Sequence, residues 1–268
     1  MKMYFSLFRM KLIAGMQYRA AAWAGIATQF FWGFMVIMIY EAFYRSSSAG
    51  NLPMDFDQVC RYVWLQQAFL YLFNLWNRDN ELLEMITSGT VSYELCRPLE
   101  LFPFWYARLL GQRLAGTVLR CVPVLMIASL LPGAYRMTLP PSVPHALLFL
   151  AALTVAMLLA TAINMFVYIL TFKLMNAGGA ALIVSAFSEF LSGSLIAIPF
   201  MPKTLQYVLY VLPFRYTADF PFRFYSGNIP MTEGLWSLAA AVGWLAVLCL
   251  LGAVLMKRAL RTAVLQGG

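Results

Sequence analysis

The sequence predicts an all-α integral membrane protein, folded as a single transmembrane domain over residues 1–268. Hydrophobic residues make up 62% of the chain, charged residues only 11%, and the mean hydropathy is +0.74. A soluble domain is nearer half apolar and a quarter charged. Six stretches are also long and apolar enough to cross about 30 Å of hydrocarbon, which takes roughly 20 helical residues. This composition excludes a secreted domain, a cytosolic enzyme and a disordered protein.

Six transmembrane helices are expected in order along the chain. The second is the most polar, because Arg61, Gln66 and Gln67 lie within it, but Trp64 and Trp76 bound it like the aromatic belt of a membrane interface. The expected helices cover residues 20–43, 58–76, 109–131, 145–171, 177–199 and 235–256.

Residues 1–19 are expected to form an amphipathic helix on the membrane surface before the first span. They combine apolar residues such as Phe8 and Leu12 with basic ones, a pattern typical of interfacial helices. A simple basic flank is the alternative. The apolar run that starts near residue 20 is too long for a signal peptide. Lys and Arg are about twice as frequent on the side of the N-terminus, so the positive-inside rule predicts that both termini are cytoplasmic.

The connection between the second and third spans, residues 77–108, is long and charged. Asp79 and Glu81 suit the first turn of a helix, where the dipole favours anions, and Gly89 suits its end. One side of this helix is apolar and consists of Leu82, Leu83, Met85 and Ile86. We therefore predict a short capped helix in the cytoplasm, which either docks on a partner protein or only joins two spans.

A polar stripe marks the fifth expected span, at the i, i+3/i+4, i+7 spacing of one helix face. The stripe consists of Ser185, Ser188, Glu189 and Ser192. A carboxylate inside the bilayer is costly unless it faces a bundle interior, water or a partner. Glu189 is therefore a candidate for a translocation path or a subunit interface. The alternative is a structural hydrogen bond, for instance to Asn164 or Gln67.

The common catalytic and nucleotide-binding motifs are absent from the sequence. No GxxxxGK[ST] run occurs, so ATP binding through a P-loop is excluded, and GxSxG and HExxH are missing as well. A single histidine, His145, and four cysteines without CxxC spacing predict no metal site and no disulfide framework. The net charge of +8 is spread over the flanks of the spans, which predicts membrane orientation rather than nucleic-acid binding.

Two sets of motifs resemble those of the ABC-2 type transporter permeases, most closely the bacterial stand-alone permeases that work with a separate ATPase subunit. The first is the run from Glu84 to Thr90 followed by Leu95-Cys96-Arg97-Pro98, which is similar to the family's inner-loop pattern. The second is similar to its outer signature and lies in and before the proline-rich segment 200–234. It comprises Leu191-Ser192-Gly193, Ile198-Pro199, Pro202, Leu212-Pro213-Phe214, Pro221 and Tyr225-x-Gly227. The similarity covers nearly the whole chain.

This resemblance implies the permease half of an ATP-driven exporter in the bacterial inner membrane. Family permeases pair with an identical or a related permease, and two ATPase subunits, which hold ATP and Mg, bind beneath them. The inner helix would then be a coupling helix, residues 1–19 a connecting helix, and residues 200–234 short extracellular helices that cap the exit.

The candidate residues fall into three groups. For coupling to the ATPase, the resemblance implies Glu81, Leu82, Glu84, Met85, Ile86, Ser88 and Gly89. For the translocation path or dimer interface, the candidates are Asn164, Ser185, Ser188, Glu189 and Ser192. For the extracellular gate, they are Pro199, Pro202, Pro213, Phe214 and Pro221.

Two other classes of function stay open. An ATP-independent secondary transporter would use ion ligands in broken helices and often an inverted repeat. A non-transporting membrane scaffold would use the inner helix for a partner that is not an ATPase. For an exporter, a narrow and mostly apolar path between spans one, two and five suits lipid-like, amphiphilic or hydrophobic peptide cargo.

Overall fold

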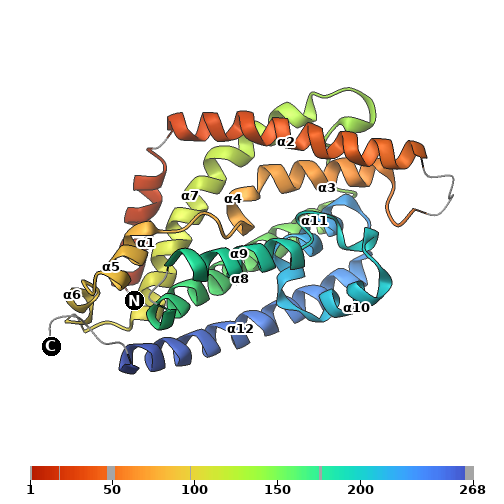
Figure 1. The fold of residues 1–268 in the computed structure, drawn as a ribbon. Coiled ribbons are helices and arrows are strands. Elements are labelled where there is room, and N and C mark those ends of the chain that lie inside the picture. The colour runs from red at the N-terminus through yellow and green to blue at the C-terminus, as the bar shows by residue number, and fades with distance from the viewer. Residues whose placement is uncertain (1, 18, 47–51, 97, 175–176, 263–268) are drawn as a thin grey trace.

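The computed structural model contains helices and no strand over the residues that it describes, which are 2–17, 19–46, 52–96, 98–174 and 177–262 (Figure 1). The prediction of an all-α protein is therefore confirmed. The α-helices are α1 (Lys2–Gly15), α2 (Arg19–Ser46), α3 (Phe56–Ala68), α4 (Leu70–Phe73), α5 (Asn80–Thr87), α6 (Ser92–Leu95), α7 (Leu101–Ser129), α8 (Val143–Leu174), α9 (Ala177–Leu191), α10 (Lys203–Val211), α11 (Asp219–Ser226) and α12 (Met231–Thr262). Three 3-10 turns are η1 (Gly133–Tyr135), η2 (Ile198–Phe200) and η3 (Pro213–Thr217).

Four of the described helices are long and apolar enough to cross a membrane. They correspond to the first, third, fourth and sixth expected spans, although the third begins well before the predicted residue 109. The four segments are Ala22–Ser46, Leu101–Ser129, Val143–Leu174 and Met231–Arg261. The chain is thus a multi-pass membrane protein.

The segments 58–76 and 177–199 do not form the long single helices that their hydropathy predicts. The α3–α4 run stops at Phe73, after which Asn74 is extended, with φ −66° and ψ 132°. In the second segment, α9 stops at Leu191. Each helix is shorter than the roughly 20 residues that a straight crossing takes, so the predicted helix boundaries are wrong at these two places.

Polar side chains from neighbouring helices satisfy the backbone where these two helices stop. Nη1 of Arg113 in α7 donates to the carbonyls of Leu72 at 2.5 Å and Asn74 at 3.0 Å. Just after α9, the Tyr62 hydroxyl donates to the carbonyl of Gly193 at 3.0 Å. Irregular backbone at membrane depth is stable where the protein supplies such partners. Hydropathy does not reveal these breaks, because the partners come from distant parts of the chain.

The central helix of the bundle is α8, with α7, α9, α11 and α12 packed against it. The main core around it is rich in aromatic side chains, including Trp64, Phe149 and Phe222. Only a small share of the residues in the outer helix α12 is buried, which suits contact with lipid. In Figure 1, α5, α6 and the C-terminal end of α12 lie at one end of the bundle, and α10 and α11 lie at the other.

The predicted N-terminal helix is present as α1, which packs along α7. Its close approach depends on Gly111 in α7, where a Cβ would lie 2.6 Å from the carbonyl oxygen of Phe8. The opposite face of α1 exposes Phe5, Met10 and Ile13. An exposed apolar face on a helix at the end of a membrane bundle is the arrangement of an interfacial helix.

Candidate functional site

Local sequence determines both ends of α5, the predicted inner helix. Asp79 is its N-cap, and its side chain accepts a hydrogen bond from the backbone N–H of Leu82 at 3.4 Å. Ser88 is the C-cap, and Gly89 follows with φ 77°, the left-handed conformation that glycine adopts most readily. The prediction of a short helix that ends at Gly89 is therefore confirmed.

The apolar face of α5 is buried within this chain. Leu82, Leu83 and Ile86 belong to one apolar cluster with Trp105 of α7 and Tyr168 of α8. Two of the predicted coupling residues, Leu82 and Ile86, thus contact the chain's own helices. The side of α5 that is left to solvent is polar and consists of Glu81, Glu84, Thr87 and Ser88, followed by Thr90, while Met85 is half-buried.

A buried ion pair joins the start of α5 to α7. Nε of Arg108 donates to Oδ2 of Asp79 at 2.5 Å, and Nε2 of Gln112 donates to the same oxygen at 2.6 Å. The backbone N–H of Asp79 donates to the Tyr168 hydroxyl of α8 at 3.0 Å. Burial raises the pKa of the Asp79 carboxyl, but the hydrogen bond and charge of Arg108, with help from Gln112, outweigh burial and lower the pKa below its usual value. Asp79 is therefore ionised. Its contacts with Arg108 and Tyr168 attach the start of α5 to α7 and α8.

A second carboxylate extends this link to α1. Arg108 also donates to Glu81 through Nη2, and Nζ of Lys11 in α1 lies 3.6 Å from Oε2 of Glu81. We call Lys11, Asp79, Glu81, Arg108 and Gln112 the α5 clamp. It connects α5 to α1 and α7, so that a displacement of α5 would be passed to both. The sequence analysis did not select Arg108 and Gln112 as candidate residues. The pattern that could have indicated them is an arginine near the start of an apolar helix.

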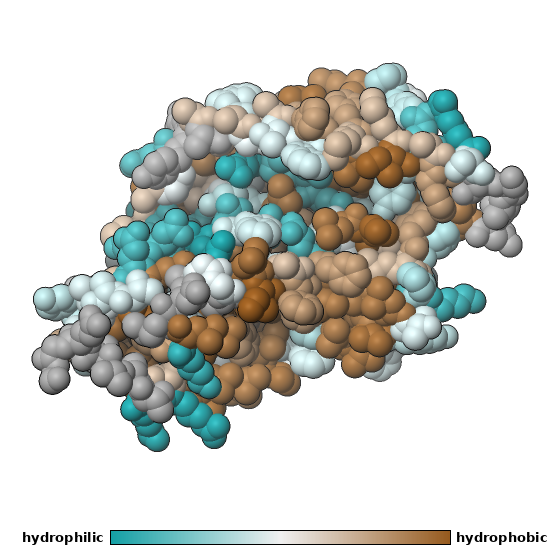
Figure 2. Space-filling view, viewed as in Figure 1, coloured by the Kyte–Doolittle hydropathy of each residue, from teal (hydrophilic) through white to brown (hydrophobic). Residues whose placement is uncertain are grey.

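A groove of about 530 Å³ lies between α2, the α3–α4 segment and α9. Figure 2 shows it as a hydrophilic hollow between two hydrophobic flanks of the molecule. Its polar lining consists of Thr28, Gln29, Gln66, Gln67, Asn74, Asn77, Arg120, Glu189 and Ser194. Its apolar lining includes Trp32, Val36, Leu70, Phe73 and Leu195. Such a surface matches an amphiphilic molecule or the apolar and polar side chains of another protein.

Glu189 lies in this groove, and its hydrogen-bond partner is neither Asn164 nor Gln67. Its Oε2 accepts from the indole N–H of Trp76 at 2.9 Å. The serines of the same stripe, Ser185, Ser188 and Ser192, are buried against the segment that follows α4. Only the carboxylate of the predicted stripe therefore lines the groove.

Asn164, the fifth candidate of this group, lies away from the groove. It belongs to α8, is 1% exposed, and neither of its amide atoms has a hydrogen-bond partner. It lines a second cavity, of about 410 Å³, beside α1 and α7. The structure thus does not bring Asn164 together with Glu189.

Two glutamines of the groove were not among the candidate site residues, although Gln67 was named as a possible partner of Glu189. Gln29 of α2 is 3% exposed, and neither its amide nitrogen nor its oxygen is hydrogen-bonded. Oε1 of Gln67 is also buried without a partner. A buried polar group without a partner costs about 1–3 kcal/mol, so these amides lower the stability of the chain as the structure describes it. Gln29 could have been selected from the sequence, because it is a polar residue within the apolar run 20–43.

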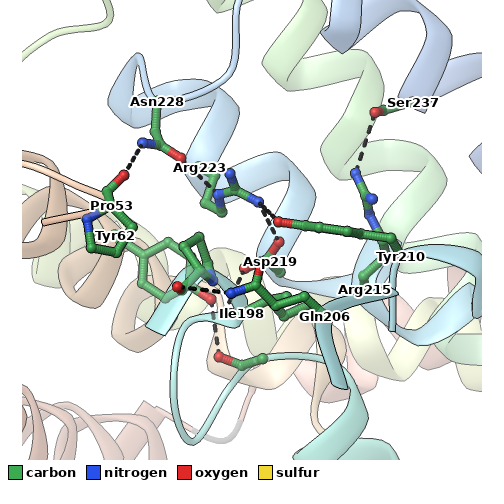
Figure 3. A network of polar contacts seen from close by, with 12 residues as sticks. Pro53, Tyr62, Ile198, Gln206, Tyr210, Arg215, Asp219, Arg223, Asn228 and Ser237 are labelled. Atoms are coloured by element: carbon green, nitrogen blue, oxygen red, sulfur yellow. Dashed lines mark hydrogen bonds and ion pairs between the residues drawn. The ribbon is translucent and has the colours of Figure 1, made fainter. Parts of the chain in front are cut away.

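A network of polar side chains lies at the opposite end of the bundle, at α10 and α11 (Figure 3). Asp219 at the start of α11 is fully buried; its Oδ1 accepts from the backbone N–H of Ile198 at 3.2 Å, and its Oδ2 accepts from Nη1 of Arg223 at 3.3 Å. Nε of Arg223 donates to Asn228 at 2.8 Å, and Asn228 donates to the carbonyl of Pro53 at 3.0 Å. The network therefore joins three separate connections at this end.

The predicted gate residues lie in the short helices and turns between α9 and α12, as Asp219 and Arg223 do. Pro199 lies in η2, Pro202 precedes α10, Pro213 begins η3 with Phe214 next to it, and Pro221 is buried in α11. The short helices expected in 200–234 are therefore present. The sequence analysis missed Asp219 and Arg223, whose opposite charges four residues apart were a usable signal. Over the described residues, no group of three or more His, Cys, Asp or Glu side chains could hold a metal ion.

Comparison with known families identifies the chain. A family model described as ABC-2 family transporter protein matches residues 55–267. None of the curated proteins matches the chain. The family model covers α3 to α12, and therefore α5 with Asp79, Glu81, Arg108 and Gln112 of its clamp, whereas α1 and α2 lie before the matched range. Given this match over most of the sequence, and the multi-pass helical architecture, the chain belongs to the ABC-2 transporter family.

Proposed function

We propose that this protein is the membrane-spanning permease subunit of an ATP-driven exporter. Two copies of a separate P-loop ATPase subunit would hold ATP and Mg, since this sequence has no P-loop of its own. The observation that carries the proposal is α5, a helix with an exposed polar face that the α5 clamp fastens to α1 and α7. A helix that only connected two spans would need no such fastening.

The docking surface for the ATPase would be the exposed side of α5. Glu84, Ser88 and Thr90 project there, whereas Leu82 and Ile86 form the anchored underside. One short helix makes a small interface, so a substitution on its exposed side would weaken docking without unfolding the chain. The force of ATP-driven closure would pass through Asp79 and Arg108 into α7.

The translocation path would run along the groove between α2, α4 and α9, completed by a second permease, identical or related. Six spans would result if α3–α4 and α9 cross together with the irregular segments that follow them. The buried polar amides of Gln29 and Gln67 and the carboxylate of Glu189 would face the polar part of an amphiphilic cargo. The end with α5 would be cytoplasmic, in the bacterial inner membrane, with both termini on that side.

Affinity purification from the native cell in mild detergent tests the proposal. We expect a P-loop ATPase to copurify with the wild-type chain and to be lost from Glu84→Arg, together with transport-linked ATP hydrolysis. The matched control is Glu100→Arg, which changes an exposed carboxylate outside α5 that pairs with Lys257. Recovery of the intact chain without an ATPase, or equal recovery of the ATPase by the two variants, would contradict the proposal.

A further inference from the structure

The cavity beside α1 and α7 is lined by positive charge. It has a volume of about 410 Å³ and lies between α1, the α4 end of the interrupted helix and α7, near the end of the bundle that holds α5. Its lining contains four basic side chains and no carboxylate. The basic residues are Lys11, Arg78, Arg113 and Arg120.

The guanidinium groups of this cavity have no anionic partner among the described residues. Arg113 is 4% exposed, and its Nη1 donates only to the carbonyls of Leu72 and Asn74. The guanidinium of Arg120 stacks on the ring of Tyr71, 4.7 Å from its centroid. Lys11 is the exception, since its ammonium lies 3.6 Å from Glu81.

The nearest carboxylates are already engaged elsewhere. Asp79 and Glu81 both accept from Arg108, and Glu81 also meets Lys11, so neither pairs with Arg78, Arg113 or Arg120 of the cavity. Cationic side chains inside a membrane domain are costly unless a counter-charge or water meets them. The cavity is therefore a place where an anion lowers the electrostatic energy of the folded chain.

Asn164 provides a second and independent indication of a ligand. Its side chain lines the same cavity, is 1% exposed, and leaves both amide atoms without a hydrogen bond. Leaving a polar group buried and unpaired costs about 1–3 kcal/mol. An oxygen-rich anion in the cavity would accept from the Asn164 amide as well as from the guanidinium groups.

The chemistry and position of the cavity indicate a phosphate group carried by a lipid. Arginine forks match phosphate oxygens with two parallel hydrogen bonds. Basic pockets between transmembrane helices bind anionic lipid headgroups. The lining also has an apolar part, which includes Ala14, Leu109 and Leu119, and α1, with its exposed apolar residues, borders the cavity. We propose that this cavity binds the phosphate of an anionic phospholipid headgroup.

The site adjoins the groove. Asn77 and Arg120 line both cavities, so a bound headgroup would lie next to the amides and carboxylate of the groove. The proposal does not rest on transport, because lipid binding is measured on the chain by itself. Its failure would leave the exporter proposal intact, and failure of ATPase copurification would leave the lipid site intact.

The test measures phospholipid retained by the purified full chain. The chain is incubated in mild detergent with equal amounts of phosphatidylglycerol and phosphatidylcholine, and bound lipid is counted by native mass spectrometry. We expect retention of phosphatidylglycerol in preference to phosphatidylcholine, and a loss of about tenfold in Arg120→Gln, as for one charge-assisted hydrogen bond. Arg120→Lys, which keeps the charge, should retain most of the binding.

The matched control is Lys173→Gln, which removes an exposed positive charge near the same end of the bundle but outside the cavity. Asn164→Ala gives a second variant in the cavity without a change in charge. Arg113→Gln is less useful, because it also removes the hydrogen bonds to the break after α4. Circular dichroism and gel filtration verify that each variant is folded.

Three results would overturn the proposal. Equal retention by Arg120→Gln and Lys173→Gln would place the lipid outside this cavity. Equal retention of phosphatidylcholine would exclude selection by an anionic headgroup. In a separate arm with inorganic phosphate, thermal stabilisation that Arg120→Gln abolishes, without any retained phospholipid, would identify a free phosphate compound as the ligand in place of a lipid.

Discussion

Arg108 and Asp79 form an ion pair with a 2.5 Å separation of Nε and Oδ2, and both side chains are at least 94% buried. The two residues lie 29 positions apart in the sequence, on a long apolar helix and at the N-cap of a short one. Loss of Arg108 would leave the buried carboxylate of Asp79 without its charged partner, whereas Arg108 also pairs with Glu81. This buried ion pair is the main contact that attaches α5 to α7.

The first prediction concerns this ion pair. We expect Arg108→Met to lower the free energy of unfolding by about 3–5 kcal/mol, the usual effect of leaving a buried charge unpaired. Thermal unfolding in detergent measures the change. As a control, Arg45→Met removes the exposed pair with Glu41, for which about 0–1 kcal/mol is expected. Equal effects of the two substitutions would show that the clamp is not energetically important.

The second prediction concerns the pH dependence of stability. The pKa of Asp79 is lowered in the folded chain from a reference value of 3.8, because Arg108 and Gln112 outweigh the effect of burial. Its ionised form therefore stabilises the fold above about pH 3.8, and this contribution is lost as the pH falls through the lower folded pKa.

Comparison of the wild type with Asp79→Asn isolates this contribution. The difference between their thermal midpoints should be constant near neutral pH and shrink as the pH falls below about 3.8. Glu100→Gln, at an exposed carboxylate, serves as the control and should give a difference near zero throughout. A difference for Asp79→Asn that grew on acidification would have the wrong sign for this explanation.

The third prediction concerns the break after α9. The Tyr62 hydroxyl donates to the carbonyl of Gly193 from a fully buried position, at 3.0 Å. Tyr62→Phe should lower the free energy of unfolding by about 1 kcal/mol, because Gln66 still donates to the same carbonyl at 3.3 Å. Tyr207→Phe is the matched control on an exposed ring and should have no measurable effect. Equal unfolding curves for the two variants would refute the role of Tyr62.

The fourth prediction concerns Gly193 itself. Its φ of +80° strains any residue with a Cβ, and a Cβ there would lie 3.1 Å from the Cβ of Asp219. Gly133 has a similar φ of +60° but open space around it. Gly193→Ala should therefore cost more than Gly133→Ala, which costs about 1–2 kcal/mol for the backbone alone. Thermal unfolding of both variants measures the difference, and a larger effect at Gly133 would contradict the packing around Gly193.

Local signals in the sequence were sufficient to predict some of the helices of this protein. The hydrophobic length of four segments predicted four membrane helices, because length and apolarity are properties of the segment alone. Asp79 and Glu81, which suit a first turn, and Gly89, which suits a helix end, predicted the short helix α5. The short helices in residues 200–234 were implied by the resemblance to the family, and the structure contains α10 and α11 there.

Tertiary structure alone decided the contacts that define the candidate sites. The helices at 58–76 and 177–199 end early because Arg113 and Tyr62 supply hydrogen bonds from elsewhere in the chain. Glu189 meets Trp76, and Asn164 lies in another cavity, although both residues were candidates for one polar path. Such pairings depend on how the helices pack against one another. A single sequence specifies which side chains are polar, but packing determines which of them meet.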